Sequence, residues 1–374
     1  MLHPRGLSAW TQTVSTILPH LSRAQIAVLA SYSFASMLVQ GAGISQVTAF
    51  LAELLGQSEN TVRQRLRETL YDMSDKRGDK RREVEVDTCF APLLSWVLGK
   101  WRSDDGLVLA MDAITLRQAF TVLVISVVVG QSAIPVAWTV VSATKKEAWK
   151  PHWRRMLREL RGLTGDRPVW MAADRGLYAR WLFRDLRACG WHPLLRINAR
   201  GSVVIRETGQ RFPLTYVAER VRGGFWHGQV VCFRDKRRQL ACTLLALWDE
   251  GQQEAWLLVT DLPPGQTSPA WYSLRMWIEA GFKALKTGGL HWERTRMTDP
   301  ARAERLWLVM ALAVTGAACA APSEPPLSDL PRLSLVRRGL IRILAACVRG
   351  DTLPPLILPA FHLPPPPTLE FIPL

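Results

Sequence analysis

The spacing of apolar positions divides the chain into a helical first part and a mixed second part. Residues 1 to about 104 have the pattern of helices, beginning with a largely apolar one at 22–40. The last two of these segments are separated by a short polar break at 57–60, so the pair resembles a helix-turn-helix, a motif that places its second helix in a DNA groove. An ordinary helical hairpin has the same pattern. The predicted helices span 22–40, 41–56 and 61–72.

From residue 105 the pattern changes to short runs rich in Val, Ile and Ala, separated by turn residues. Such runs predict β-strands. Three of them follow one another, and then helices and strands alternate, which indicates an α/β domain with a mixed sheet. The predicted strands are 107–116, 120–129, 133–141, 168–176 and 192–198, and the predicted helices between them are 149–165 and 179–190.

A second group of strand-like runs, between residues 199 and 262, predicts an all-β insertion. After it come a helix at 272–286, a strongly apolar helix at 301–320, a short basic helix at 335–350, and a proline-rich end that we expect to be extended and poorly packed, or wrapped on a partner subunit. The expected divisions are a helical DNA-binding region at 1–104, a catalytic domain at 105–198 and 263–322 interrupted by the insertion at 199–262, and a tail at 323–374.

Charge changes this picture by indicating a polyanionic partner. The chain has 47 Lys and Arg against 32 Asp and Glu, a formal net charge of +15, which favours nucleic acid first and an anionic membrane second. Residues 306–322 are apolar enough to cross a bilayer, but their Trp, Thr and Gly favour a buried helix. The start of the chain lacks a signal pattern, and its six cysteines form no CxxC pair. We expect a cytoplasmic protein with no membrane association.

The candidate chemistry is concentrated in the segment 272–286. Tyr272, Arg275, Glu279 and Lys286 would share an arc of about 60° on a helix, with Lys283 beside them. An amphipathic helix with a solvated basic face would show the same pattern.

Two aspartates lie in apolar surroundings earlier in the chain. Asp112 lies within a predicted strand, and Asp174 follows the apolar run Val169–Ala173 in another. A carboxylate in such a place costs several kcal/mol unless it is paired or bound to a metal. Each could also be a hydrogen-bonded core aspartate, and residues 112 and 174 alone do not distinguish the two interpretations.

The spacing Tyr-x2-Arg-x3-Glu-x6-Lys resembles the signature of DDE transposases of the insertion-sequence-four family, and Asp112 and Asp174 match the two earlier acids of that family. The resemblance covers about residues 105–315 and implies an RNase H-like catalytic domain. It also implies two Mg²⁺ ions, for which Mn²⁺ would substitute, held by Asp112, Asp174 and Glu279.

The same resemblance implies roles in DNA binding. Arg275 and Lys286 would contact phosphates beside the scissile bond, Tyr272 would contact a neighbouring phosphate, and Lys283 would lie beside them. Arg175 is a candidate phosphate contact or a surface ion pair. Trp226, or its neighbour Phe225, is a candidate for stacking on a flipped base, or a core aromatic.

The function expected from these features is metal-dependent cleavage of double-stranded DNA at transposon ends, followed by transfer of the 3′-hydroxyl into target DNA. The resemblance implies a homodimer in the DNA complex, associated with the nucleoid. Two alternatives stay open: a transposase-derived DNA-binding protein that no longer cuts, and another RNase H-like nuclease such as a resolvase.

Overall fold

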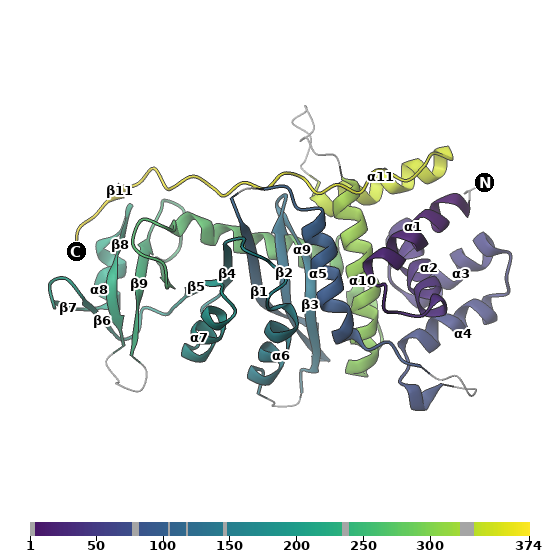
Figure 1. Cartoon of the computed structure of the whole chain (residues 1–374), viewed down its shortest axis with the longest axis horizontal. Coiled ribbons are helices and arrows are strands. Elements are labelled where there is room, and N and C mark those ends of the chain that lie inside the picture. Colours follow the sequence, from purple (N-terminus) through teal and green to yellow (C-terminus); the bar gives the residue numbers. More distant parts are fainter. Residues whose placement is uncertain are drawn as a thin grey trace. The chain divides into compact units, whose positions relative to one another are not determined.

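In the computed structural model (Figure 1), the structure describes residues 4–76, 82–103, 105–116, 119–144, 148–233, 239–321 and 333–374. The chain forms two compact units, each assembled from separate segments. Unit 1 contains Met1–Ser103, Ala113–Thr164 and Trp277–Phe361, and unit 2 contains Asp104–Asp112, Gly165–Met276 and His362–Leu374.

The helical first part of the chain belongs to unit 1, and its predicted helices are confirmed. Ser22 forms a capping box with Gln25 at the start of one helix, and the Ser58 hydroxyl accepts a hydrogen bond from the Thr61 amide at the start of another. The predicted linker at 75–85 is only partly described, because residues 77–81 lie outside the described ranges. The helices are α1 (Pro4–Ile17), α2 (Arg23–Val39), α3 (Ile44–Leu55), α4 (Glu59–Leu70) and α5 (Phe90–Gly99), with short 3₁₀ turns at Met73–Asp75 and Val86–Cys89.

The rest of unit 1 is an antiparallel hairpin packed with helices. Gly130 and Gln131 both have positive φ at the hairpin turn, which suits a two-residue turn between twisted strands. Gly281 lets α9 approach this hairpin, since a Cβ there would lie 2.7 Å from the Ala133 carbonyl oxygen. The elements are β2 (Phe120–Val129), β3 (Ser132–Ser142), α6 (Lys150–Leu160), α9 (Trp277–Lys286), the 3₁₀ turn η4 (Trp292–Arg294), α10 (Pro300–Ala320) and α11 (Leu335–Arg349).

The apolar helix α10 is buried, as predicted. Among the described helices, α10 is the only one that is long and apolar enough by itself to cross a membrane. Helices α2 and α3, taken together as one bent segment, are also long and apolar enough. However, 94% of the most apolar stretch of α10 is buried within the structure. The core helix of a globular unit shows the same properties.

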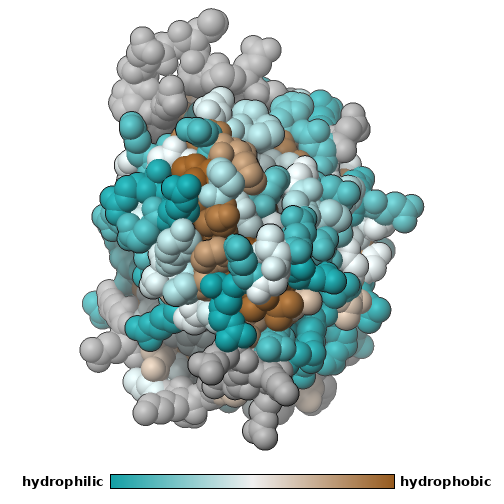
Figure 2. Space-filling view, turned by 90° about the vertical axis from the view of Figure 1, so that its left-hand side faces the viewer, coloured by the Kyte–Doolittle hydropathy of each residue, from teal (hydrophilic) through white to brown (hydrophobic). Residues whose placement is uncertain are grey.

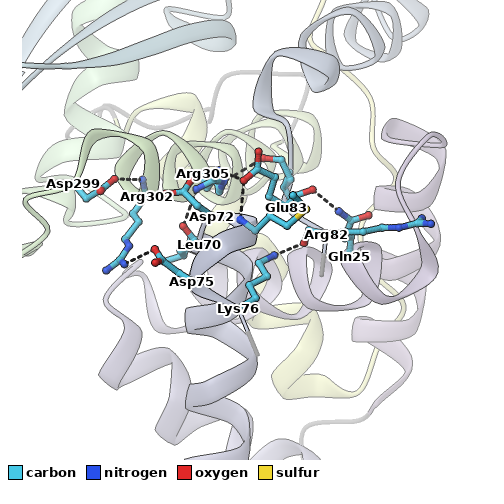
Figure 3. Close-up of polar contacts among 12 residues, drawn as sticks. Gln25, Leu70, Asp72, Asp75, Lys76, Arg82, Glu83, Asp299, Arg302 and Arg305 are labelled. Carbon is cyan, nitrogen blue, oxygen red and sulfur yellow. Dashed lines mark hydrogen bonds and ion pairs between the residues drawn. The ribbon is translucent and has the colours of Figure 1, made fainter. Parts of the chain in front are cut away.

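Arg305 on α10 anchors the loop that follows α4 (Figure 3). Its side chain, 9% exposed, pairs with Asp72 at 2.7 Å and Glu83 at 3.2 Å. It also donates hydrogen bonds to the carbonyl oxygens of Leu70 at 3.1 Å and Val84 at 3.2 Å. This buried cation therefore fixes both ends of the segment 70–84 against α10.

Unit 2 is a mixed sheet with a helix-bearing insertion. β1, β4 and β5 run parallel, and the following strands are antiparallel, in the order β1-β4-β5-β10-β9-β8-β6-β7. The predicted order of three strands, helix, strand, helix and strand is confirmed. The chain is a mixed α/β protein with a helical N-terminal region, and its mixed sheet is consistent with an RNase H-like domain. The elements are β1 (Leu107–Leu116), β4 (Val169–Ala173), α7 (Arg180–Ala188), β5 (His192–Arg196), β6 (Ser202–Ile205), β7 (Arg211–Pro213), α8 (Leu214–Arg220), β8 (Gly224–Cys232), β9 (Leu240–Leu247), β10 (Trp256–Thr260), η3 (Pro269–Met276) and β11 (Glu370–Phe371).

One predicted strand of the insertion is mostly helix. Residues 211–221 form the short strand β7 and then α8, which buries Leu214, Val217 and Ala218. That three- to four-residue spacing suits a helix, so the insertion is mainly rather than wholly β-structure.

The C-terminal tail is extended, as predicted, but it is packed on its own chain. In unit 1, Phe361 is 2% exposed and its ring lies 5.1 Å from that of Trp101. In unit 2, the Trp271 indole donates a hydrogen bond to the Pro364 carbonyl oxygen, and β11 pairs in parallel with β8. The prediction of poor packing is therefore wrong around Leu358 and Phe361, which are buried, whereas residues 362–374 are all partly or fully exposed.

Large apolar side chains also reach the surface of unit 2. Tyr216 on α8 is 45% exposed and stacks on Phe212, and Phe371 on β11 is 44% exposed. Figure 2 views the side on which Figure 1 labels these elements, and it shows apolar surface within a hydrophilic surround.

Candidate active site

Asp112 and Asp174 lie at the same edge of two parallel strands. The last registered pair of β1 and β4 is Met111 with Ala173, so Asp112 is the next residue of β1 and Asp174 directly follows the end of β4. The strands before them are fully buried, whereas the side chains of Asp112 and Asp174 are 19% and 36% exposed. The fold thus brings two carboxylates from distant parts of the chain to the same partly exposed end of neighbouring strands.

Arg275 joins these two carboxylates. Its Nη2 atom lies 2.8 Å from Asp112 Oδ2 and 4.0 Å from Asp174 Oδ2. The guanidinium is 12% exposed, so this pair is shielded from solvent more than a surface ion pair is. One cation therefore compensates both acids.

Tyr272 lies on the same 3₁₀ segment as Arg275, η3, and contacts Asp174. Its hydroxyl donates a long hydrogen bond of 3.3 Å to Asp174 Oδ1. Burial raises the pKa of Tyr272 above its usual value, so the phenol keeps the proton that it donates. Its ring belongs to the core of unit 2, 5.1 Å from the ring of Trp256.

The segment 272–286 is not one α-helix, which corrects the prediction. Tyr272 and Arg275 lie on η3, whereas Glu279 and Lys286 lie on α9. In a 3₁₀-helix, residues three apart eclipse each other, and this explains why Tyr272 and Arg275 both face Asp174. The change of helix type falls at the boundary between units, after Met276.

The remaining residues of the predicted signature belong to unit 1. Glu279 is exposed in the first turn of α9, where a negative charge is favourable for the helix dipole. Lys283, one turn further on, is also exposed. Lys286 donates a hydrogen bond of 3.0 Å to the Thr115 carbonyl oxygen.

Arg175 forms a surface ion pair. Its Nη1 atom lies 2.7 and 2.9 Å from the two carboxylate oxygens of Glu254, and Arg196 contacts the same carboxylate at 2.9 Å. The Arg175 and Glu254 side chains are 47% and 52% exposed. A phosphate contact by Arg175 would compete with Glu254.

Trp226 is buried in β8. It is 6% exposed, and a Cβ at Gly228 would lie 2.4 Å from its ring. Stacking on a base would require this side chain to leave its place, so the structure supports the core-aromatic interpretation of Trp226.

Residues 107–315, more than half of the chain, match the family described as Transposase DDE domain. The chain belongs to the DDE transposase family. No curated protein matches its sequence. Asp112, Asp174 and Arg275 all fall within the matched region of this transposase.

The two aspartates of the transposase suit a divalent cation by their chemistry. Mg²⁺ prefers oxygen ligands and few protein contacts, and Asp112 and Asp174 present partly exposed carboxylates that already share one cation. Within the described ranges, no group of three Asp, Glu, His or Cys side chains is close enough to hold a metal. Unit 2 alone therefore supplies two of the three predicted acids.

The sequence did not reveal the residues that support this site. Glu254 and Trp256 hold Arg175 and Tyr272, and both lie in or beside β10. No local pattern marks them, because each partner lies in a different segment of the chain.

Proposed function

We propose that the chain is a metal-dependent DNA transposase of the insertion-sequence-four family. It would cleave phosphodiester bonds at transposon ends and transfer the resulting 3′-hydroxyl into target DNA. The convergence of Asp112 and Asp174 on Arg275 carries this proposal, because it gathers two acids and one signature residue of the family at one place.

Asp112, Asp174 and Glu279 are the proposed ligands of two Mg²⁺ ions, for which Mn²⁺ would substitute. A pair of such ions activates the attacking hydroxyl and stabilises charge on phosphorus and the leaving oxygen. All three carboxylates would supply the oxygen ligands that such ions prefer. The protonated Tyr272 hydroxyl would orient Asp174 by its hydrogen bond.

The cations of the signature would bind DNA phosphates. Arg275 would move its guanidinium from the acids to a phosphate beside the scissile bond, and Lys286 and Lys283 would contact phosphates along the same strand. Arg175 would join them only by leaving Glu254, so its contribution would be smaller. Trp226 would contribute through the packing of β8.

The proposed partner is double-stranded DNA, at transposon ends and at the target, bound by a homodimer at the nucleoid in the cytoplasm. The net charge of +15 supports a polyanionic partner. In the proposed N-terminal DNA-binding region at 1–104, Arg65 and Arg67 are exposed on α4, the second helix of the α3–α4 hairpin.

Glu279→Gln tests this proposal against a protein that binds DNA without cutting it. The change removes a metal-binding charge but little volume, so the variant should fold and bind the element's own end sequence as the wild type does, while cleavage is lost. Wild-type binding without cleavage under any divalent ion would instead support the silent DNA-binding protein. Loss of folding in the variant would make Glu279 a structural residue.

A further inference from the structure

Unit 1 contains a basic hollow of about 460 Å³, and of its lining residues only Lys283 is among the DNA contacts proposed above. Its walls come from the β2–β3 turn, from α9 and the residues after it, and from the start of α11. Among the described residues that line it, the charged ones are Lys283, Arg337 and Arg338, all cationic. The volume falls in the range of ligand pockets, about 300–1,000 Å³.

The positive charges at the start of α11 are unfavourable for the stability of this helix. Arg337 and Arg338 lie in or next to its first turn, which contains no acid. The N-terminus of a helix carries a partial positive charge, so a cation there is unfavourable. An anion in the hollow would offset this cost and would also face the amide groups of the first turn.

Other contacts hold these cations in place. Arg337 donates a hydrogen bond to the side-chain oxygen of Gln40. α11 packs closely on α10, since a Cβ at Gly339 would overlap the Ala317 carbonyl group. The start of α11 is therefore fixed without help from a ligand.

One donor in the hollow lacks a partner within the described part of the chain. The Arg338 Nε atom is buried and has no hydrogen-bond acceptor, whereas the Lys283 side chain is exposed. A buried donor without an acceptor is unfavourable. The Arg338 Nε atom therefore indicates a missing acceptor, and Lys283 adds a second positive charge beside it.

We infer that this hollow binds a backbone phosphate of DNA, with Lys283, Arg337 and Arg338 as its cationic contacts. The described lining residues include no aromatic side chain on which a base could stack, so the phosphodiester rather than a nucleotide is the ligand. α11 lies beyond the matched region 107–315, and the hollow would bring this C-terminal helix into DNA binding. This inference rests on the proposed function, because it names a second contact for the same DNA.

The test is the salt dependence of DNA binding by the full chain. Each phosphate contact contributes about 0.9 to the slope of log K against log salt. Arg338→Gln should therefore make this negative slope shallower by about 0.9. The double variant Lys283→Gln with Arg338→Gln should make it shallower by about 1.8. Arg338→Lys keeps a point charge and should restore most of the slope.

Arg349→Gln is the matched control, because it removes the same charge from the last turn of the same helix, where Arg349 pairs with exposed Asp351. An unchanged slope in Arg338→Gln, or an equal change in Arg349→Gln, would overturn the inference. So would binding of inorganic phosphate that Arg338→Gln abolishes while the DNA slope stays the same, since the hollow would then be a free-phosphate site. Wild-type protein that binds no DNA would refute the proposed function itself.

Discussion

The guanidinium of Arg275 lies 2.8 Å from the carboxylate of Asp112, although 163 residues separate them in the chain. In the absence of DNA and metal, the proposed phosphate-binding residue thus neutralises a proposed metal ligand. A divalent cation would compete with Arg275 for the Asp112 carboxylate, and an anionic phosphate would compete with Asp112 for the Arg275 guanidinium. We expect metal and DNA binding to support each other for this reason.

Arg275→Ala tests that competition. Without its guanidinium, Asp112 and Asp174 lose their shared cation, and like charges in proximity favour a bound cation. The DNA-free variant should therefore bind Mn²⁺ more tightly than the wild type. In DNA binding, the negative slope of log K against log salt should become shallower by about 0.9. Calorimetric titration with Mn²⁺ and binding at several salt concentrations measure the two effects. Weaker Mn²⁺ binding together with an unchanged salt slope would show that Arg275 only holds the fold.

Glu304 on α10 makes stability depend on pH. Burial raises its pKa from 4.5 to about 7, although Arg155 lies 3.8 Å away and opposes the shift. The folded state then keeps a proton that the unfolded state loses above pH 4.5, so stability falls as pH rises from about 4.5 to 7. The loss is on the order of 3 kcal/mol.

Glu304→Gln removes this titration. The variant should be more stable than the wild type at pH 8, by up to a few kcal/mol, and should lose the fall between pH 4.5 and 7. Chemical denaturation at several pH values checks this, with Glu53→Gln on the exposed side of α3 as a control that leaves the profile unchanged. A Gln variant that is less stable at pH 8 would mean that the ionised carboxylate is favourable in its site.

Arg305→Met tests the anchor of the N-terminal helical part (Figure 3). The change leaves Asp72 and Glu83 without this cation and two carbonyl groups without a donor. Arg305 is 9% exposed, but Asp72 and Glu83 are 39% and 34% exposed, so we expect the loss to come mainly from the unpaired buried carbonyl groups. It should be about 1–3 kcal/mol, which chemical denaturation would detect.

Arg302→Met is the matched control on the same helix. Arg302 pairs with Asp75 at 3.0 Å, but these side chains are 37% and 45% exposed, so we expect a loss below about 1 kcal/mol from that pair. Equal losses in both variants would contradict the special role of Arg305.

The order of elements could be predicted from sequence because alternation and turn residues are local signals. The acids were found for the same reason, since each stands out against an apolar strand. The split of 272–286 into η3 and α9 was missed because both helix types accept the same apolar spacing, and the choice depends on contacts of Tyr272 with the sheet. The ion pair of Arg275 with Asp112 and the packing of Phe361 on Trp101 join distant segments, so no local pattern could show them.

The most direct test of the metal-site claim is cleavage of a labelled duplex that carries the element's own end sequence. The reaction is run with Mg²⁺, with EDTA, and with Asp112→Ala in place of the wild type. We predict nicking at the end of the element with Mg²⁺ alone, and none with EDTA or with the variant, which still binds the duplex. Cleavage by Asp112→Ala at the wild-type rate, or wild-type cleavage in EDTA, would contradict the account.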